Sequence, residues 1–190
     1  ASHYEVIAAK PSPISAFKLK SKAYLSMDEL QGWCSKEKAS VLIDLILILK
    51  PKIVVEIGVF GGKSLVPMAY ALQETGGKII GIDPWSSNES AIGMEGVNLE
   101  FWGNLNHDNI YLELNNKIKK FGLENQISLL RKTSEAAAPI KDIDIIHIDG
   151  NHSEETSLFD VLKWVPLVKK GGLIIFDDVN WETTKAATDY

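Results

Sequence analysis

Short apolar runs alternate with stretches of helical periodicity along most of this chain. Apolar runs bounded by polar or glycine residues predict five buried strands, at 53–57, 78–83, 127–130, 143–148 and 173–176. Between them, apolar residues recur at the spacing of a helical face, which predicts helices at about 39–49, 65–75, 106–121 and 158–165. Strands that are apolar on both faces and alternate with helices indicate an α/β fold. We expect a doubly wound, mainly parallel sheet with helices on both faces.

The first part of the chain lacks this regularity. Residues 1–25 have no sustained period and contain two prolines, so we expect an extended N-terminal extension before a single domain of residues 26–190. Ser26 followed by Glu29 has the form of a capping box and predicts that a short helix begins there.

Local signals set the expected ends of the later elements. Ser35 is placed to cap the helix that Pro51 closes, and Gly171 with Gly172 is placed to stop the helix before the last strand. The Ser-, Asn- and Gly-rich residues 84–98 are long for a connection without structure, and such loops are often lids over a binding site. We interpret this stretch as a lid.

Composition and charge narrow the classes of function. The 190 residues, 45% of them hydrophobic, support one sizeable core. A net charge of −5 without a cluster of Lys or Arg argues against a nucleic-acid surface. The single Cys34 excludes an internal disulfide and fits a reducing compartment, and the apolar run 43–49 is too short to span a membrane. We expect a cytoplasmic protein without nucleic-acid or membrane partners, whose apolar helix 39–49 is either core or the contact of a homo-oligomer.

Three acids follow two of the predicted strands. Asp149 ends the fourth strand, and Asp177 with Asp178 ends the fifth. The carboxyl ends of parallel strands line the ligand crevice of an open sheet, and converging oxygen ligands suit a hard cation such as Mg²⁺. A single acid at a strand end often only marks the return to solvent. Three acids at two such ends, beside a glycine-rich turn, favour a site.

The turn after the first strand allows a phosphate-loop interpretation. Gly62, Lys63 and Ser64 fit the end of that motif, but the motif needs a glycine at position 57, where this chain has isoleucine. Gly58 leaves the loop one residue short of the length that cradles a phosphate. The chain also has only one arginine, so a charge-stabilising arginine within the chain is not expected.

A nucleoside without a phosphate fits the turn better. The dinucleotide fingerprint fails because position 60 is phenylalanine, but Glu56 precedes Gly58 by two residues. Asp83 ends the next strand, close to the distance along the chain at which an acid reaches a ribose hydroxyl. A cationic nucleoside would favour the acid and would not need a lysine cradle, and S-adenosylmethionine is such a ligand.

With these motifs in order, the chain resembles the class I S-adenosylmethionine-dependent methyltransferases, which have a Rossmann-like fold, over about residues 33–181. It is most similar to metal-dependent O-methyltransferases, namely catechol-type enzymes and sugar O-methyltransferases of antibiotic biosynthesis. The resemblance implies S-adenosylmethionine and Mg²⁺ or another divalent cation as cofactors. It places a group of residues around the cofactor: Glu56, Gly58, Gly62 and Ser64 at the methionine portion, Asp83 at the ribose, and Ser134 and Trp85 by the adenine, with Trp85 equally open to a core role. Asp149, Asp177 and Asp178 would hold the metal, with Asp149 also beside the cofactor.

The resemblance also implies a mechanism. Catechol-type enzymes carry a catalytic lysine three residues after the first metal acid, where this chain has His152. We therefore expect His152 to be the general base that takes a proton from a metal-bound hydroxyl of a small sugar-like or polyphenolic acceptor. Two other classes stay open: a P-loop-like nucleotide hydrolase and a non-catalytic S-adenosylmethionine-binding module.

Other residues receive a structural interpretation or none. His147 lies inside a strand and is expected to be a hydrogen-bonded core residue, His107 to be solvated, and Asp144 to be structural at the far end of the sheet. Phe101 and Trp102 either wall a pocket or pack a helix. Class I methyltransferases normally add two strands after the last one found here, so the domain is expected to be C-terminally incomplete or completed by a partner chain.

Overall fold

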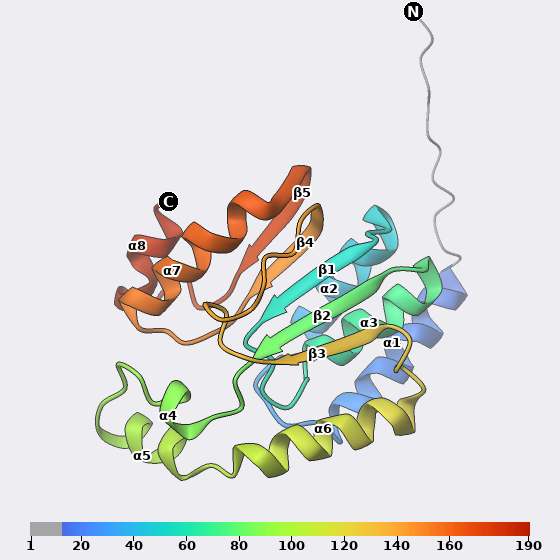
Figure 1. Cartoon of the computed structure of the whole chain (residues 1–190). Helices are drawn as coiled ribbons and strands as arrows, with labels where there is room; N and C mark the ends of the chain where they lie inside the picture. Colours follow the sequence, from blue (N-terminus) through green and yellow to red (C-terminus); the bar gives the residue numbers. More distant parts are fainter. Residues whose placement is uncertain (1–12) are drawn as a thin grey trace, which may run out of the picture.

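Five parallel strands form the centre of the fold in the computed structural model, which describes residues 13–190. They are β1 (Ile53–Ile57), β2 (Lys78–Asp83), β3 (Ile127–Arg131), β4 (Ile143–Ile148) and β5 (Val168–Phe176). Their order in the sheet is β3-β2-β1-β4-β5, and every neighbouring pair is parallel (Figure 1). The chain therefore moves outward from β1 in one direction and then in the other. This order confirms the predicted doubly wound, Rossmann-like sheet.

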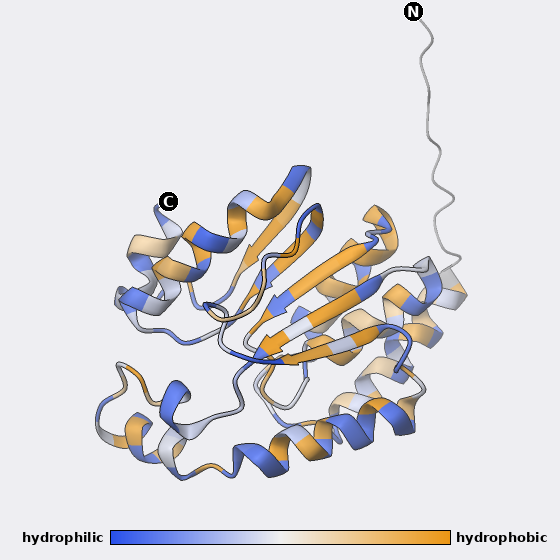
Figure 2. Ribbon diagram, in the orientation of Figure 1, coloured by the Kyte–Doolittle hydropathy of each residue, from blue (hydrophilic) through white to orange (hydrophobic). Residues whose placement is uncertain are grey.

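Helices cover both faces of this sheet. The helices are α1 (Pro13–Met27), α2 (Lys36–Leu49), α3 (Leu65–Thr75), α4 (Ser87–Ser90), α5 (Gly96–Asn104), α6 (His107–Phe121), α7 (Glu154–Trp164) and α8 (Lys185–Thr188), with short 3₁₀ turns η1 (Val165–Leu167) and η2 (Glu182–Thr184). Val54 packs with α1, α2, α3 and α6 in one hydrophobic cluster, and its neighbour Val55 packs with α7 and α8 in another. Figure 2 shows that β1 is hydrophobic along most of its length. Because successive side chains of a strand face opposite ways, both faces of β1 are therefore apolar.

The N-terminal expectation was wrong for the described residues. Helix α1 occupies residues predicted to be extended, and its Leu19 and Ala23 are buried in the cluster around α3. Ser26 does not begin a helix, because its hydroxyl donates to the carbonyl of Ala23 in the last turn of α1. Tertiary packing of a few apolar side chains therefore decides this helix. Residues 1–12 of the expected extension lie outside the described part.

The next helix has the predicted ends. The Ser35 hydroxyl accepts a hydrogen bond from the backbone N–H of Lys38 and so caps the start of α2. Lys50 adopts a left-handed conformation after the last turn, and Pro51 follows it. These local signals were sufficient to fix α2.

Gly171 and Gly172 do not stop a helix. Helix α7 already ends at Trp164, and both glycines lie within β5. Ile143 of β4 pairs with Val168, and Ile145 pairs with Leu173, so the intervening residues of β5 protrude from the ladder. Gly171, at φ 81°, provides the left-handed turn that this irregularity requires.

The stretch 84–98 is not structureless. It contains α4 and the start of α5, and the Asn151 side chain holds the segment by donating to the carbonyl of Ile92 at 2.9 Å. Within residues 13–190, no helix combines the length and the apolar character needed to cross a membrane.

Candidate functional site

A cavity of about 960 Å³ opens at the carboxyl ends of the strands. Its wall includes Gly58 after β1, Asp83 at the end of β2, Asp149 after β4 and Asp177 after β5. The volume suits a ligand the size of a nucleoside conjugate together with a small second molecule. The sheet therefore collects the polar residues of four separate segments around one space, as the sequence predicted.

Two of the three glycines in the loop after β1, Gly58 and Gly62, have a left-handed backbone. Gly58 has φ 82°, and a Cβ there would lie 1.9 Å from the carbonyl oxygen of Asp149. Gly62 has φ 81°, and a Cβ there would lie 2.5 Å from a methyl group of Leu114. Gly58 lines the cavity, whereas Gly62 packs against α6 outside its wall. Gly62 therefore shapes the loop, and its contact with a cofactor stays a prediction.

Asp83 holds this loop in place. Its Oδ2 accepts hydrogen bonds from the N–H groups of Val59 and Phe60 at 3.0 and 2.9 Å, and its Oδ1 accepts from the N–H of Trp85 at 2.7 Å. Burial raises the pKa of Asp83, and the three N–H groups oppose that rise by stabilising the carboxylate. The carboxylate also lines the cavity, so one side chain both orders the loop and faces the ligand space.

Trp85 belongs to the hydrophobic core. It is 1% exposed, its indole N–H donates to the carbonyl of Phe60 at 2.8 Å, and its ring lies 4.8 Å from that of Tyr111. These contacts agree with the core role, and its contact with an adenine ring stays a prediction.

Glu56 is buried beneath the loop. Its Oε1 accepts from the hydroxyl of Ser64 at 2.5 Å and lies 2.8 Å from Nδ1 of His147, and both Glu56 and His147 are fully buried. Ser64 lines the cavity above Glu56, and the contact of Glu56 with a cofactor stays a prediction. The expectation that His147 is a hydrogen-bonded core residue is confirmed.

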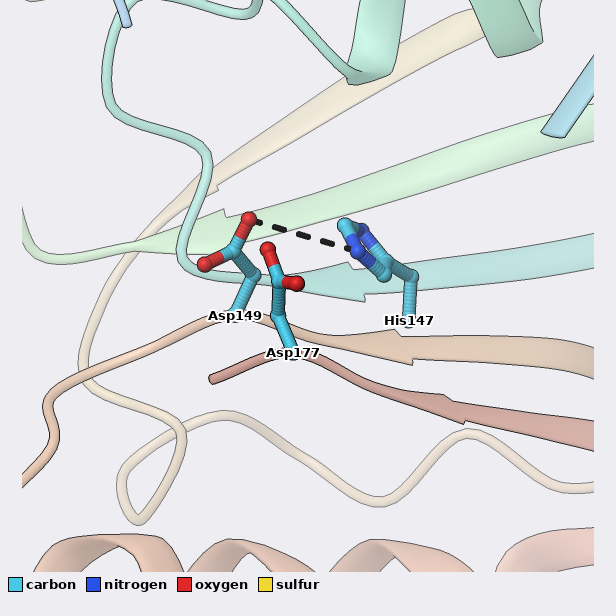
Figure 3. A group of neighbouring side chains, drawn as sticks. All are labelled: His147, Asp149 and Asp177. Atoms are coloured by element: carbon cyan, nitrogen blue, oxygen red, sulfur yellow. Dashed lines mark ion pairs between the residues drawn. The ribbon is translucent and has the colours of Figure 1, made fainter. Parts of the chain in front are cut away.

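The three predicted metal acids divide into two groups that share Asp149. One group brings the ligand atoms of His147, Asp149 and Asp177 within 4.8 Å of one another, and Figure 3 shows the three side chains together. The other brings together Asp149, His152 and Asp178. Asp177 and Asp178 are chain neighbours but face different partners, since Asp178 has a left-handed backbone at φ 51°.

A lysine lies at the first of these groups. Lys38, from the first turn of α2, hydrogen-bonds both Asp149 (3.3 Å) and Asp177. Burial raises the pKa of Asp149 to about 7, and the charges of His147 and Lys38 oppose the rise. Burial acts in the same direction on Asp177, but the hydrogen bond and charge of Lys38, a hydrogen bond with Asp149 and the charge of His147 together outweigh it and lower the pKa of Asp177. The pair of carboxylates thus holds one positive charge.

His152 lies at the mouth of the cavity, just before α7. Its Nε2 is 3.2 Å from Oδ2 of Asp178, and its ring packs against Trp181 at 4.9 Å between centroids. Burial lowers the pKa of His152, although Asp178 and Asp177 act in the opposite direction. The ring is therefore neutral near pH 7, in the form that accepts a proton.

Ser134 has a partner that the sequence did not reveal. Its hydroxyl donates to the buried carboxylate of Asp160 on α7, and both residues line the cavity. Burial raises the pKa of Asp160 to about 7, and the hydrogen bond from Ser134 and the charge of Lys163 oppose this rise.

Aromatic side chains wall the opposite part of the cavity. Trp33 stacks on Phe60 at 5.3 Å between centroids and lies 5.9 Å from Phe101 and 5.7 Å from Trp102. The open question about Phe101 and Trp102 is thus decided in favour of the pocket wall. His107 is 5% exposed, so its expected solvation was wrong.

Comparison with known proteins agrees with this geometry. The sequence model of a methyltransferase domain family matches residues 55–179. The chain belongs to this methyltransferase family. The match spans the loop after β1, Asp83, Asp149 and the acids after β5, and it confirms the resemblance derived from those motifs. No curated protein sequence matches the chain significantly.

Solved methyltransferase structures share the fold at low sequence identity. A methyltransferase from Podospora anserina, bound to S-adenosylhomocysteine, is 15% identical with a TM-score of 0.57 over 94% of this chain and 74% of that one. The O-methyltransferase TomG from Streptomyces achromogenes, involved in tomaymycin synthesis and bound to S-adenosylmethionine, is 16% identical with a TM-score of 0.57 over 85% and 66%. An O-methyltransferase from Bacillus cereus in complex with S-adenosylhomocysteine is 18% identical with a TM-score of 0.54 over 90% and 69%.

Within this methyltransferase domain, Lys38 and Asp160 are the site residues that sequence reasoning missed. Each lies on a helix face without a motif, so no local signal marks it. Asp144, in contrast, has the structural role that was expected: it accepts from the N–H groups of Lys52 and Ile53 at the opposite end of the sheet.

Proposed function

We propose that this protein is an S-adenosylmethionine-dependent O-methyltransferase that acts on a hydroxyl group of a sugar-like or polyphenolic small molecule. The observation that carries the proposal is the shared wall of one cavity, which is lined both by the pair Gly58 and Asp83 and by the set Asp149, Asp177 and His152. The first pair matches a nucleoside ligand, and the second set matches an oxygen nucleophile that loses a proton. Methyl transfer needs these two partners in line and close.

The cofactor half of the proposal follows from polarity. The Asp83 carboxylate has about four acceptor sites, and its three backbone donors leave about one of them, on Oδ1, to accept from a ribose hydroxyl. The tight turn at Gly58 keeps side chains away from the ligand, and Ser134 with Asp160 offers polar groups for the adenine. Structural relatives bound to S-adenosylmethionine or S-adenosylhomocysteine support this choice of ligand.

We also propose that a divalent cation, Mg²⁺ or another, assists the transfer. The donors fit a cation, because Asp149 and Asp177 already hold the ammonium group of Lys38, and Asp178 adds a third carboxylate nearby. When bound, such an ion would polarise two neighbouring oxygens of the acceptor and lower the pKa of one hydroxyl. Asp149, shared by both groups of ligand atoms, is the residue that would hold it in either arrangement.

His152 then accepts the hydroxyl proton. Its burial keeps the ring neutral, and Asp178 fixes its orientation at the cavity mouth. Trp33, Phe60, Phe101 and Trp102 present flat apolar surfaces to the acceptor. The single half-buried Cys34 fits a reducing compartment, so we place the reaction in the cytoplasm.

Calorimetry separates the proposal from the two other classes of function. We expect calorimetry to show binding of S-adenosylmethionine and S-adenosylhomocysteine and no binding of ATP. In a separate assay with divalent ions, we expect transfer of labelled methyl groups to a catechol or to a sugar with vicinal hydroxyls. Affinity for ATP with no response to S-adenosylmethionine would establish a nucleotide hydrolase instead. Cofactor binding without metal binding or turnover on a broad panel of acceptors would leave a non-catalytic module.

A further inference from the structure

A fully buried histidine points an unpaired nitrogen toward the acids of the cavity. His147 and Glu56 are both 0% exposed, and His147 Nδ1 lies 2.8 Å from Glu56 Oε1. The other ring nitrogen, Nε2, has no hydrogen-bond partner among the described residues and lies 4.0 Å from Oδ2 of Asp149 (Figure 3). A buried polar atom without a partner is rare and costs free energy, so it calls for an explanation.

The partners of His147 fix its proton. A carboxylate at Glu56 accepts from Nδ1–H, and Ser64 holds that carboxylate by donating to the same oxygen at 2.5 Å. Nε2 then faces the Asp149 carboxylate without a partner of its own, and a cation between the two would bind both. A metal-bound histidine typically has this arrangement, with its second nitrogen donating to a carboxylate or a carbonyl.

We propose that His147 Nε2, Asp149 and Asp177 form a nitrogen–oxygen centre for one first-row transition-metal ion, such as Co²⁺, Mn²⁺ or Zn²⁺, in preference to Mg²⁺. Imidazole nitrogen favours these ions, whereas Mg²⁺ prefers oxygen ligands alone. Glu56 is the outer carboxylate that orients the histidine. The binding stands by itself, and only its use in methyl transfer rests on the proposed function.

Lys38 competes for this centre. Its ammonium group bonds Asp149 and Asp177, the two carboxylates that the ion would need. Its side chain is 25% exposed and comes from the first turn of α2, so it has room to swing toward solvent when an ion arrives. Removing this charge should therefore strengthen metal binding.

The second group of ligand atoms lacks these features. His152 already has Asp178 within 3.2 Å of its Nε2, and its side chain is 20% exposed. No side-chain atom of His152 or Asp178 is a buried polar atom without a hydrogen-bond partner. Asp178 therefore distinguishes the two groups, because it offers a ligand atom to the second group and none to the proposed centre.

The test is titration of the metal-free protein with Co²⁺ and with Mg²⁺ by calorimetry, without cofactor or acceptor. We expect Co²⁺ to bind at least ten-fold more tightly than Mg²⁺, His147→Gln to weaken Co²⁺ at least ten-fold, and Lys38→Met to strengthen it at least ten-fold. Asp178→Asn should weaken Co²⁺ less than His147→Gln does, and the control Glu124→Gln, at an exposed acid in the turn before β3, should leave Co²⁺ affinity within about two-fold. Pulsed electron paramagnetic resonance of the Mn²⁺-loaded wild-type protein should show coupling to a directly bound histidine nitrogen, which needs no variant to fold.

Three results would overturn the inference. They are Co²⁺ binding lost in Asp178→Asn but kept in His147→Gln, equal affinities for Co²⁺ and Mg²⁺, and the absence of nitrogen coupling in the Mn²⁺-loaded protein. The proposed function fails separately. Co²⁺ binding as expected without methyl transfer would support this centre and contradict the proposed function. Methyl transfer without binding of any ion would support the proposed function and contradict this centre.

Discussion

The Nε2 atom of His152 lies 3.2 Å from Oδ2 of Asp178, and both residues line the same cavity. This contact leaves Nδ1 as the ring nitrogen that is open to a substrate proton. Because Asp178 follows β5 and His152 follows β4, the pair also connects the segments after these two neighbouring strands. Asp178 is thus a positioning residue for His152.

Replacing His152 by alanine should lower the rate of methyl transfer roughly 10²-fold, in line with general-base contributions. Affinity for S-adenosylhomocysteine, measured by calorimetry, should stay near the wild-type value because the ring does not reach the cofactor side of the cavity. Asp178→Asn should lower turnover less and leave the pH profile in place. Full turnover of His152→Ala across the pH range, on an acceptor that the wild type methylates, would disprove the role.

Asp83→Ala should weaken S-adenosylhomocysteine binding ten-fold or more. The substitution removes an ionised acceptor from three backbone N–H groups and from the ribose, and each such hydrogen bond contributes roughly 1.5–3 kcal/mol. Glu124→Ala, an exposed acid in the turn before β3, is the control and should bind as the wild type does. Unchanged affinity in Asp83→Ala would remove this carboxylate from the cofactor site.

Gly58→Ala should destabilise the protein by at least about 2 kcal/mol in urea unfolding, the range of overpacking with backbone strain. The added Cβ would meet the carbonyl oxygen of Asp149 at 1.9 Å, at a φ of 82° that alanine rarely adopts. Gly103→Ala in α5 is the matched control, because no atom lies within 4 Å of its Cβ position. That variant should be equal to or more stable than the wild type by up to about 1 kcal/mol. Equal stability of both variants would show that the loop moves away freely.

Asp160→Asn should stabilise the protein increasingly as the pH rises. The carboxyl group has its ordinary pKa of 3.8 when unfolded and about 7 when folded, so folding takes up a proton between these values. Stability of the wild type therefore falls as the pH rises through this window. The variant carries a neutral amide at this position and does not lose stability in this way. The difference in melting temperature between the variant and the wild type should increase from about pH 4 to pH 8 and reach at least about 4 °C. A difference that is independent of pH would contradict the raised pKa.

The sequence alone determined the parallel sheet and most of its helices. The strand Ile53–Ile57 is apolar at every position but Glu56, and that pattern is stable only when both faces are covered. Ser35 fixed the start of α2 by a contact three residues away. The positions of Asp83 and Asp149 followed from topology, since the carboxyl ends of parallel strands meet at one edge. Such features depend on near neighbours in the chain or on a single rule of sheet geometry.

Only the tertiary structure decided the remainder. Helix α1 exists because Leu19 and Ala23 find a surface made by α3, which no local period reveals. Trp85 turned inward because the carbonyl of Phe60 accepts its indole N–H. Lys38 contacts Asp149 across 111 residues of chain. The unpartnered Nε2 of His147 indicates a cation site only because it lies beside that carboxylate. Contacts between residues distant in sequence depend on how helices dock on the sheet, and the identity of each residue alone does not encode that docking.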